Sequence, residues 1–150
     1  MLKKIINFFE EKISAETEQD IEHHLRLATA ALMIEMMLDD GETHDAEINM
    51  LLEKLQQTFE LDLSETTELY NLAHEEVKQA VDYHQFTTLI AKNYTQKQKI
   101  KVIENLWAIA YADNYLDQYE ELMVRKIADL IYVPHADFMQ AKHRVINETG

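Results

Sequence analysis

The sequence is poor in residues that break regular structure. It has two glycines and one proline in 150 residues, well below the roughly 7% and 5% of ordinary proteins. A fold of many β-strands needs these residues in its tight turns, so their scarcity argues against a sandwich or a barrel. We therefore expect an all-α fold, and a single domain, because 47% apolar composition over this length supports one core.

Cysteine and long hydrophobic runs are also missing. Without cysteine there is no disulfide framework, no thiolate metal site and no catalytic thiol, so any metal would be held by oxygen or imidazole. The longest apolar stretch, residues 27–38, contains Thr29 and Glu35 and is shorter than the ~20 residues that span a bilayer. The N-terminal residues resemble a signal peptide, but Glu10 and Glu11 break the apolar run and no small-residue cleavage site follows. We expect a cytoplasmic protein.

Basic residues are few. The chain has 14 Lys and Arg against 28 Asp and Glu, for a formal charge of −14. Affinity for nucleic acid comes largely from cationic side chains that displace counterions from phosphates, so we expect no nucleic-acid partner. Divalent cations or basic protein surfaces suit this composition better.

Apolar residues recur at helical spacing along most of the chain and predict about eight helices. The ranges are 2–13, 21–39, 46–59, 64–81, 86–93, 96–112, 118–132 and a last helix after Pro134, with 14–20 as a loop. Asp62 or Ser64 is expected to cap the fourth helix, and Thr95 with Gln98 forms a capping box for the sixth. Several apolar positions are predicted to face the core, among them Leu69, Leu72, Ala73, Val77, Ala80 and Val81 of the fourth helix, and Leu122 and Val124 of the seventh.

A short acidic pattern occurs twice, each time after an apolar helix. Asp40-Gly41 is followed by Glu47, and Asp113-Asn114 by Glu120, at an offset of 73 residues (113 − 40 and 120 − 47). Apolar residues also pair at this offset: Ile34/Trp107, Met36/Ile109, Leu38/Tyr111, Met50/Met123 and Leu51/Val124. We infer an internal duplication. Residues 1–20 are predicted as an amphipathic helix and linker, and 21–150 as the helical domain, with halves at about 21–82 and 83–147.

The spacing from Gly41 to Glu47 equals that from the sixth to the twelfth position of an EF-hand loop. Positions one and three of that loop must supply oxygen ligands. Here they fall on Met36 and Leu38, and in the second copy on Ile109 and Tyr111. A true EF-hand is therefore excluded.

Two interpretations of the repeated pattern remain. In the simpler one, Gly41 and Asn114 adopt the left-handed conformation that closes a helix, and Glu120, three residues after Asp117, completes a capping box. In the other, Asp40, Glu47, Asp113 and Glu120 bind Ca²⁺ or Mg²⁺ weakly through oxygen. Acidic residues crowd both turns, as Asp39, Asp40, Glu42, Asp45 and Glu47 in the first and as Asp113, Asp117, Glu120 and Glu121 in the second, and His44 could add an imidazole ligand.

Several short segments in and around the second copy form a recognisable pattern: Phe86-Thr87, Leu106-Trp107-Ala108-Ile109-Ala110-Tyr111-Ala112-Asp113, Leu116-Asp117, Tyr119-Glu120-Glu121 and Arg125-Lys126-Ile127-Ala128-Asp129-Leu130. The pattern is weaker in the first copy, in Glu35-Met36-Met37-Leu38-Asp39-Asp40-Gly41 with Glu47. These segments resemble the TerB-like superfamily, named for a tellurite-resistance protein. The resemblance implies an all-α fold with internal duplication, a place in stress and membrane-associated systems, and no established enzyme activity. It also implies metal binding by acidic residues, which fall here on Asp40, Glu47, Asp113 and Glu120. Asn114 stands where glycine is usual, and Asp39 where a small residue is usual.

Three hypotheses about function follow. The first is a non-catalytic interaction or scaffold domain of a bacterial stress response, because the sequence has no nucleophile elbow, phosphate-binding loop or catalytic triad. The second is a membrane-peripheral adaptor that docks through residues 1–13, although we favour packing of this segment on the domain. The third is a metal-dependent hydrolase, which needs both acidic turns to converge. The protein partner stays open, as does homo-oligomerisation.

Other residue clusters receive structural interpretations. The methionines at 33, 36 and 37 are expected to fill the core. The histidines are expected at the surface. The lysines at 92, 97, 99 and 101 are expected on one solvated helix face, although they could receive an acidic surface or a membrane phosphate.

Overall fold

The computed structural model describes residues 18–38, 45–114 and 117–149, and within these ranges the chain is helical without strands. The helices are α2 (Glu18–Leu38), α3 (Asp45–Phe59), α4 (Leu63–Gln79), α5 (His84–Asn93), α6 (Gln96–Ala110), α7 (Gln118–Leu130) and α8 (His135–Thr149). The all-α prediction is confirmed. The predicted helix at 2–13 lies outside the described residues, and α2 begins three residues earlier than the predicted 21 because Glu18–Asp20 is helical rather than loop.

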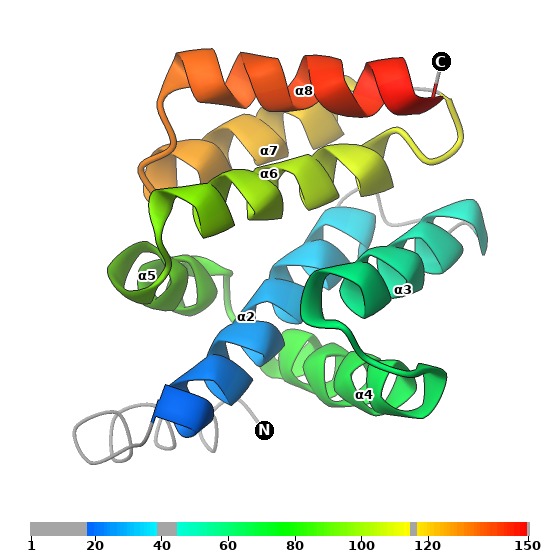
Figure 1. The fold of residues 1–150 in the computed structure, drawn as a ribbon, viewed down its shortest axis with the longest axis vertical. Coiled ribbons are helices and arrows are strands. Elements are labelled where there is room, and N and C mark those ends of the chain that lie inside the picture. The colour runs from blue at the N-terminus through cyan, green and yellow to red at the C-terminus, as the bar shows by residue number, and fades with distance from the viewer. Residues whose placement is uncertain (1–17, 39–44, 115–116, 150) are drawn as a thin grey trace.

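Helix α2 is the centre of the fold. It packs against α3, α4, α5, α6 and α7, while α6 packs against α8, α7, α3 and α2 (Figure 1). The two halves pack in a similar way. In the first half α2 contacts the two helices that follow it, α3 and α4, and in the second half α6 contacts the two that follow it, α7 and α8. This agreement supports the predicted duplication, although the exact domain and repeat boundaries remain predictions.

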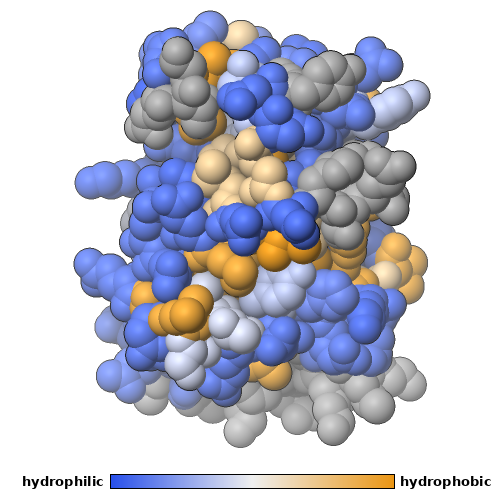
Figure 2. All heavy atoms as spheres, turned by 90° about the vertical axis from the view of Figure 1, so that its right-hand side faces the viewer, coloured by the Kyte–Doolittle hydropathy of each residue, from blue (hydrophilic) through white to orange (hydrophobic). Residues whose placement is uncertain are grey.

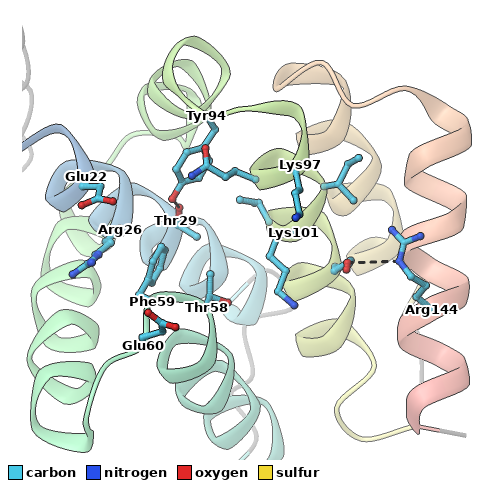
Figure 3. A pocket seen from close by; sticks show the side chains of 14 residues that line it. Glu22, Arg26, Thr29, Thr58, Phe59, Glu60, Tyr94, Lys97, Lys101 and Arg144 are labelled. Atoms are coloured by element: carbon cyan, nitrogen blue, oxygen red, sulfur yellow. Dashed lines mark hydrogen bonds and ion pairs between the residues drawn. The ribbon is translucent and has the colours of Figure 1, made fainter. Parts of the chain in front are cut away.

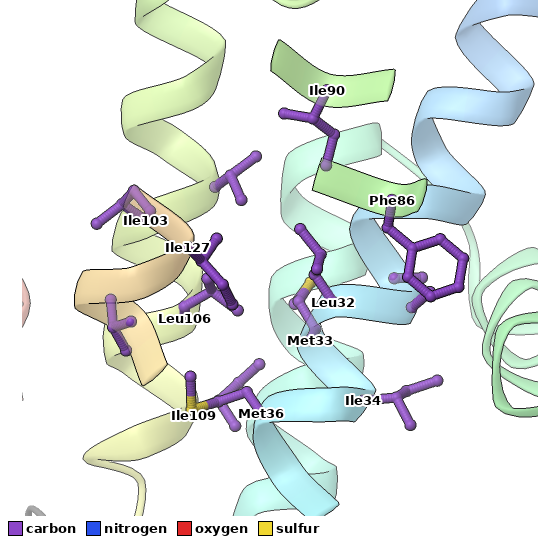
Figure 4. Close-up of a cluster of buried hydrophobic side chains, with 14 of the residues drawn as sticks. Leu32, Met33, Ile34, Met36, Phe86, Ile90, Ile103, Leu106, Ile109 and Ile127 are labelled. Carbon is purple, nitrogen blue, oxygen red and sulfur yellow. The ribbon is translucent and has the colours of Figure 1, made fainter. Parts of the chain in front are cut away.

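The core forms along the predicted apolar stripes. Leu32, Met33 and Met36 of α2 and Leu106 and Ile109 of α6 are completely buried and belong to one cluster (Figure 4). Met33, Met36 and Met37 of α2 are therefore core residues, as predicted. Burial of this apolar surface is the main stabilising force, at roughly 1.5–3 kcal/mol for each fully buried large side chain.

Local sequence signals set several helix ends. The Asp62 carboxylate accepts the Glu65 N–H at 2.7 Å while the Glu65 carboxylate accepts the Asp62 N–H at 3.0 Å. Thr95 and Gln98 form the same reciprocal box at the start of α6. Both boxes satisfy N–H groups that a helix leaves unpaired at its first turn, so the predicted caps at Asp62 and Thr95 are confirmed.

Helices α3 and α7 end alike without glycine. Glu60 and Tyr132 have φ of 54° and 66°, and the next residues, Leu61 and Val133, donate N–H groups back to Gln56 and Ala128. These five-residue bonds are the mark of a Schellman ending. With two glycines in the whole chain, other residues occupy the left-handed positions, at a cost of roughly 1–2 kcal/mol each.

Three predicted core positions are wrong. Leu72 of α4 and Leu122 of α7 are 47% and 46% exposed, and Val81 is 92% exposed. Val81 lies beyond the end of α4 at Gln79, so helical periodicity no longer sets its direction. Leu72 and Leu122 lie at the edge of their apolar stripes, where only the position of the neighbouring helices decides burial.

Candidate functional site

The first acidic corner joins α2 to α3. Helix α2 ends at Leu38 and α3 begins at Asp45, so Asp40 and Gly41 lie outside the described residues and their roles remain predictions. Glu47 lies in the first turn of α3, and its side chain is only 2% exposed.

The second corner joins α6 to α7 and is described except for residues 115–116. Helix α6 ends at Ala110, Asn114 takes the left-handed conformation with φ of 63°, and Asp117 is the N-cap of α7. The turn role predicted for Asn114 is thus confirmed. Asp113 is exposed at this corner, whereas Glu120, in the first turn of α7, is 4% exposed.

Two acids of the second corner have structural roles. The Asp117 carboxylate accepts the N–H of Tyr119 at 2.7 Å, and Glu121 accepts a bond from the Lys142 Nζ of α8 at 2.8 Å. The predicted capping box is corrected here, because Asp117 caps Tyr119 and not the N–H of Glu120.

Glu47 and Glu120 are equivalent in the repeat and are buried to a similar extent. A glutamate is almost never fully buried unless it is paired or bound to a cation. The sequence contained a signal for this burial. Glu47 and Glu120 lie four residues before the buried Leu51 and Val124, and residues four apart share a helix face.

The chemistry of the corners fits a hard cation only in part. Carboxylate oxygens suit Ca²⁺ and Mg²⁺, and the corners offer no sulfur. Among the residues with described positions, however, no group of three or more histidine, aspartate or glutamate side chains could hold a metal ion. That search does not include Asp40 or His44, so the complete ligand set proposed from the sequence remains untested.

The surface around the second corner is mostly hydrophilic. Figure 2 views the molecule from the side on which the α6–α7 connection projects in Figure 1, and hydrophilic residues there frame a smaller hydrophobic band. Tyr119 and Leu122, the exposed neighbours of Glu120 on α7, line a hollow of about 310 Å³ with Glu35 and Lys126. These exposed apolar side chains are close in sequence to the buried Glu120, which is not itself among the residues that line the hollow.

One histidine and one lysine that were predicted at the surface are buried. His24 is 1% exposed and lies in the interior of α2, which corrects the expectation of surface histidines. Lys99 is 8% exposed, with its Nζ 5.9 Å from the Tyr132 ring centroid. The four lysines therefore do not form one solvated face, because Lys99 turns away from Lys97 and Lys101, which line a groove described below.

The alternative functions depend on residues outside the described ranges. The adaptor hypothesis requires residues 1–13, and the hydrolase hypothesis requires Asp40, so both remain predictions. Within the described part of the chain, none of the helices combines the length and hydrophobicity required to cross a membrane.

A comparison with protein families places the described helices in a known family. The family described as tellurite resistance protein TerB matches residues 26–143, which is well over half of the chain and includes both corners. No curated protein and no solved structure matches the chain significantly.

Proposed function

The chain belongs to the tellurite resistance protein TerB family, and on this premise we propose that it is a non-catalytic interaction domain of a bacterial stress response. In this proposal its two acidic corners bind a divalent cation weakly. The observation that carries it is the paired burial of Glu47 and Glu120, at 2% and 4% exposure, in the first turns of α3 and α7.

The acids that would hold the cation are Asp40 and Glu47 at the first corner and Asp113 and Glu120 at the second. Calcium takes six to eight oxygen ligands from carboxylates, backbone carbonyls and water, whereas magnesium retains several waters. Two carboxylates per corner leave most ligands to carbonyls and water. We therefore expect weak binding, with dissociation constants of about 10⁻⁴–10⁻³ M.

A bound cation would connect consecutive helices. Asp113 follows the end of α6 and Glu120 belongs to α7, so a cation shared between them would fix the connection between these two helices. Tyr119 and Leu122 of α7 are exposed beside Glu120, and large exposed apolar side chains are a frequent feature of protein interaction surfaces. Cation binding would thereby order a surface that receives a protein partner.

Titration calorimetry with CaCl₂ and MgCl₂ tests the cation sites. We expect the wild type to bind, Asp113→Asn/Glu120→Gln to lose the second site, and Asp40→Asn/Glu47→Gln to lose the first. The matched control is Glu68→Gln/Asp129→Asn, which removes two exposed acids of α4 and α7 and should bind as the wild type does. Equal heats for the wild type and both corner variants would contradict the proposal.

Partner binding has a separate test. Tyr119→Ala/Leu122→Ala should retain the calorimetric cation signal and the thermal stability but lose co-purification of the partner. Unchanged co-purification would show that the partner does not bind through Tyr119 and Leu122 of α7.

A further inference from the structure

A groove of about 760 Å³ lies on the opposite part of α2 and α6 from the acidic corners. Its walls come from the first half of α2, the end of α3, the α5–α6 junction and the first half of α6, with Arg144 of α8 at one side (Figure 3). This volume is within the roughly 300–1,000 Å³ of small-molecule sites.

The floor of the groove is apolar and held in place. The Phe59 and Tyr94 rings line it, and the Tyr94 hydroxyl lies 3.1 Å from Thr29 Oγ1. The Thr29 hydroxyl donates to the Leu25 carbonyl at 2.7 Å, so Tyr94 is the donor between the two. Asn105 Nδ2 of α6 donates to Thr58 Oγ1 of α3 at 2.9 Å and ties two walls together.

Cations gather on the α6 wall. Lys97 and Lys101 lie one turn apart on α6 and line the groove, and neither has a carboxylate within ion-pair distance among the described residues. Arg26, on the α2 side, lies over the Phe59 ring at 5.6 Å. Lys97, Lys101 and Arg26 thus bring three cations to one groove of a protein of formal charge −14.

The helix itself gives no reason for these lysines. Lys97 is in the first turn of α6, where the positive end of the helix dipole disfavours a cation. The same first turn contains no acidic residue. An anion bound near the N-terminus of α6 would be favoured both by the lysines and by the dipole.

The acidic residues that line the groove do not neutralise the positive charge of the α6 wall. Glu104 is 3.7 Å from Arg144 and is paired with it. Glu22 and Glu60 come from α2 and the end of α3, on the side of the groove away from Lys97 (Figure 3). An anionic group is therefore placed best against α6.

We propose that the groove binds a small organic anion, with its carboxylate, phosphate or sulfonate group at Lys97 and Lys101 and its apolar body on Phe59 and Tyr94. The volume suits a small molecule. A nucleic acid would meet the field of a strongly acidic protein, and the two lysines of the groove are too few for affinity through counterion release.

Anilinonaphthalene sulfonate, an aromatic anion, is the probe for the full-length chain. We expect its fluorescence to titrate with one site, and Lys97→Gln/Lys101→Gln to weaken binding about tenfold, since each lost ion pair contributes a modest amount. The matched control is Lys92→Gln/Lys78→Gln, which removes the same charge from exposed positions outside the groove and should bind as the wild type does. Circular dichroism and thermal unfolding verify that both variants fold.

Competition and NMR identify the site. Phenyl phosphate and benzoate should displace the probe while neutral benzyl alcohol does not, and the amide signals of Thr29 and Tyr94 should shift on binding. Equal affinity in Lys97→Gln/Lys101→Gln and the wild type would overturn the proposal. Shifts of the same groove signals on deleting residues 1–13 without any probe would also overturn it, because the groove would then be occupied by the chain itself.

Discussion

The two ends of α2 and α6 carry opposite chemistry. Their N-terminal halves supply Arg26 and Thr29, and Lys97 and Lys101, to the groove. Their C-terminal ends lead into the acidic corners that contain Glu47 and Glu120. A helix rises 1.5 Å per residue, so roughly 20 Å separate Lys97 from the last residue of α6. One pair of core helices thus joins a cationic region to two anionic ones.

The helix dipole and helix capping explain the charged residues of the acidic corners but not those of the groove. Glutamate in the first turn of α3 or α7 is favoured by the helix dipole, and Asp117 caps α7. Lys97 in the first turn of α6 is disfavoured by the same dipole. The helix dipole thus accounts for the position of the corner glutamates but not for their burial, and it does not account for Lys97 of the groove.

The largest expected effect comes from the core that both ends share. Trp107 is 1% exposed and packs on Phe138 with ring centroids 5.1 Å apart. Trp107→Ala should lower the free energy of unfolding by about 3–5 kcal/mol, measured by urea denaturation. Both ends should be lost in one transition, because α2 and α6 belong to one core.

Tyr119→Ala is the control for this prediction. Tyr119 is 64% exposed, and its truncation should change stability by less than about 0.5 kcal/mol. Two separate unfolding transitions in Trp107→Ala would show that the halves are independent.

The next largest effect on stability is expected at the turn of the second corner. Asn114 has φ of 63°, and asparagine and glycine tolerate this conformation better than other residues. Asn114→Ala should cost about 1 kcal/mol, and Asn114→Gly should leave stability and cation binding unchanged. Thermal unfolding and calorimetry measure the two properties, and a strong loss in Asn114→Gly would indicate that the amide itself is needed.

Removing one helix cap at the groove and one at the second corner compares how much each cap contributes to stability. Thr95 caps α6 beside the groove, and Asp117 caps α7 at the second corner. Thr95→Ala and Asp117→Ala should each cost about 1 kcal/mol in chemical denaturation. Asp117→Ser keeps a capping oxygen but removes the charge, so it should retain both stability and cation affinity. A loss of cation affinity in that variant would make Asp117 a ligand.

The smallest effect concerns the groove floor at alkaline pH. Burial raises the pKa of Tyr94 above its ordinary value of 10.0. As pH rises above 10.0, Tyr94 loses its proton in the unfolded chain before it does so in the folded protein. The free energy of unfolding is therefore unaffected below this pH, and it falls as pH rises until Tyr94 also ionises in the folded protein. The wild type should therefore lose stability relative to Tyr94→Phe between pH 8 and pH 11. Parallel pH profiles of the two proteins would contradict burial as the cause.

Local signals in the sequence predicted most of the fold. Helical spacing of apolar residues located the helices, and the side chains of Asp62, Thr95 and Asp117 marked helix starts because a cap needs only its own first turn. The repeated acidic pattern identified both corners, and Asn114 as a turn residue. Burial of Glu47 and Glu120 was foreseeable from the position of Leu51 and Val124 four residues later.

The tertiary structure alone decided features that depend on neighbouring helices. Leu72 and Leu122 lie on apolar stripes yet are exposed, because burial requires a second helix above the stripe. The groove joins residues that are far apart in the sequence, such as Arg26, Phe59 and Lys101, so no spacing could reveal it. The sequence by itself determined which segments are helical and where each one turns, since these are local interactions, whereas the packing of α2 against α6 decided which charges share a cavity.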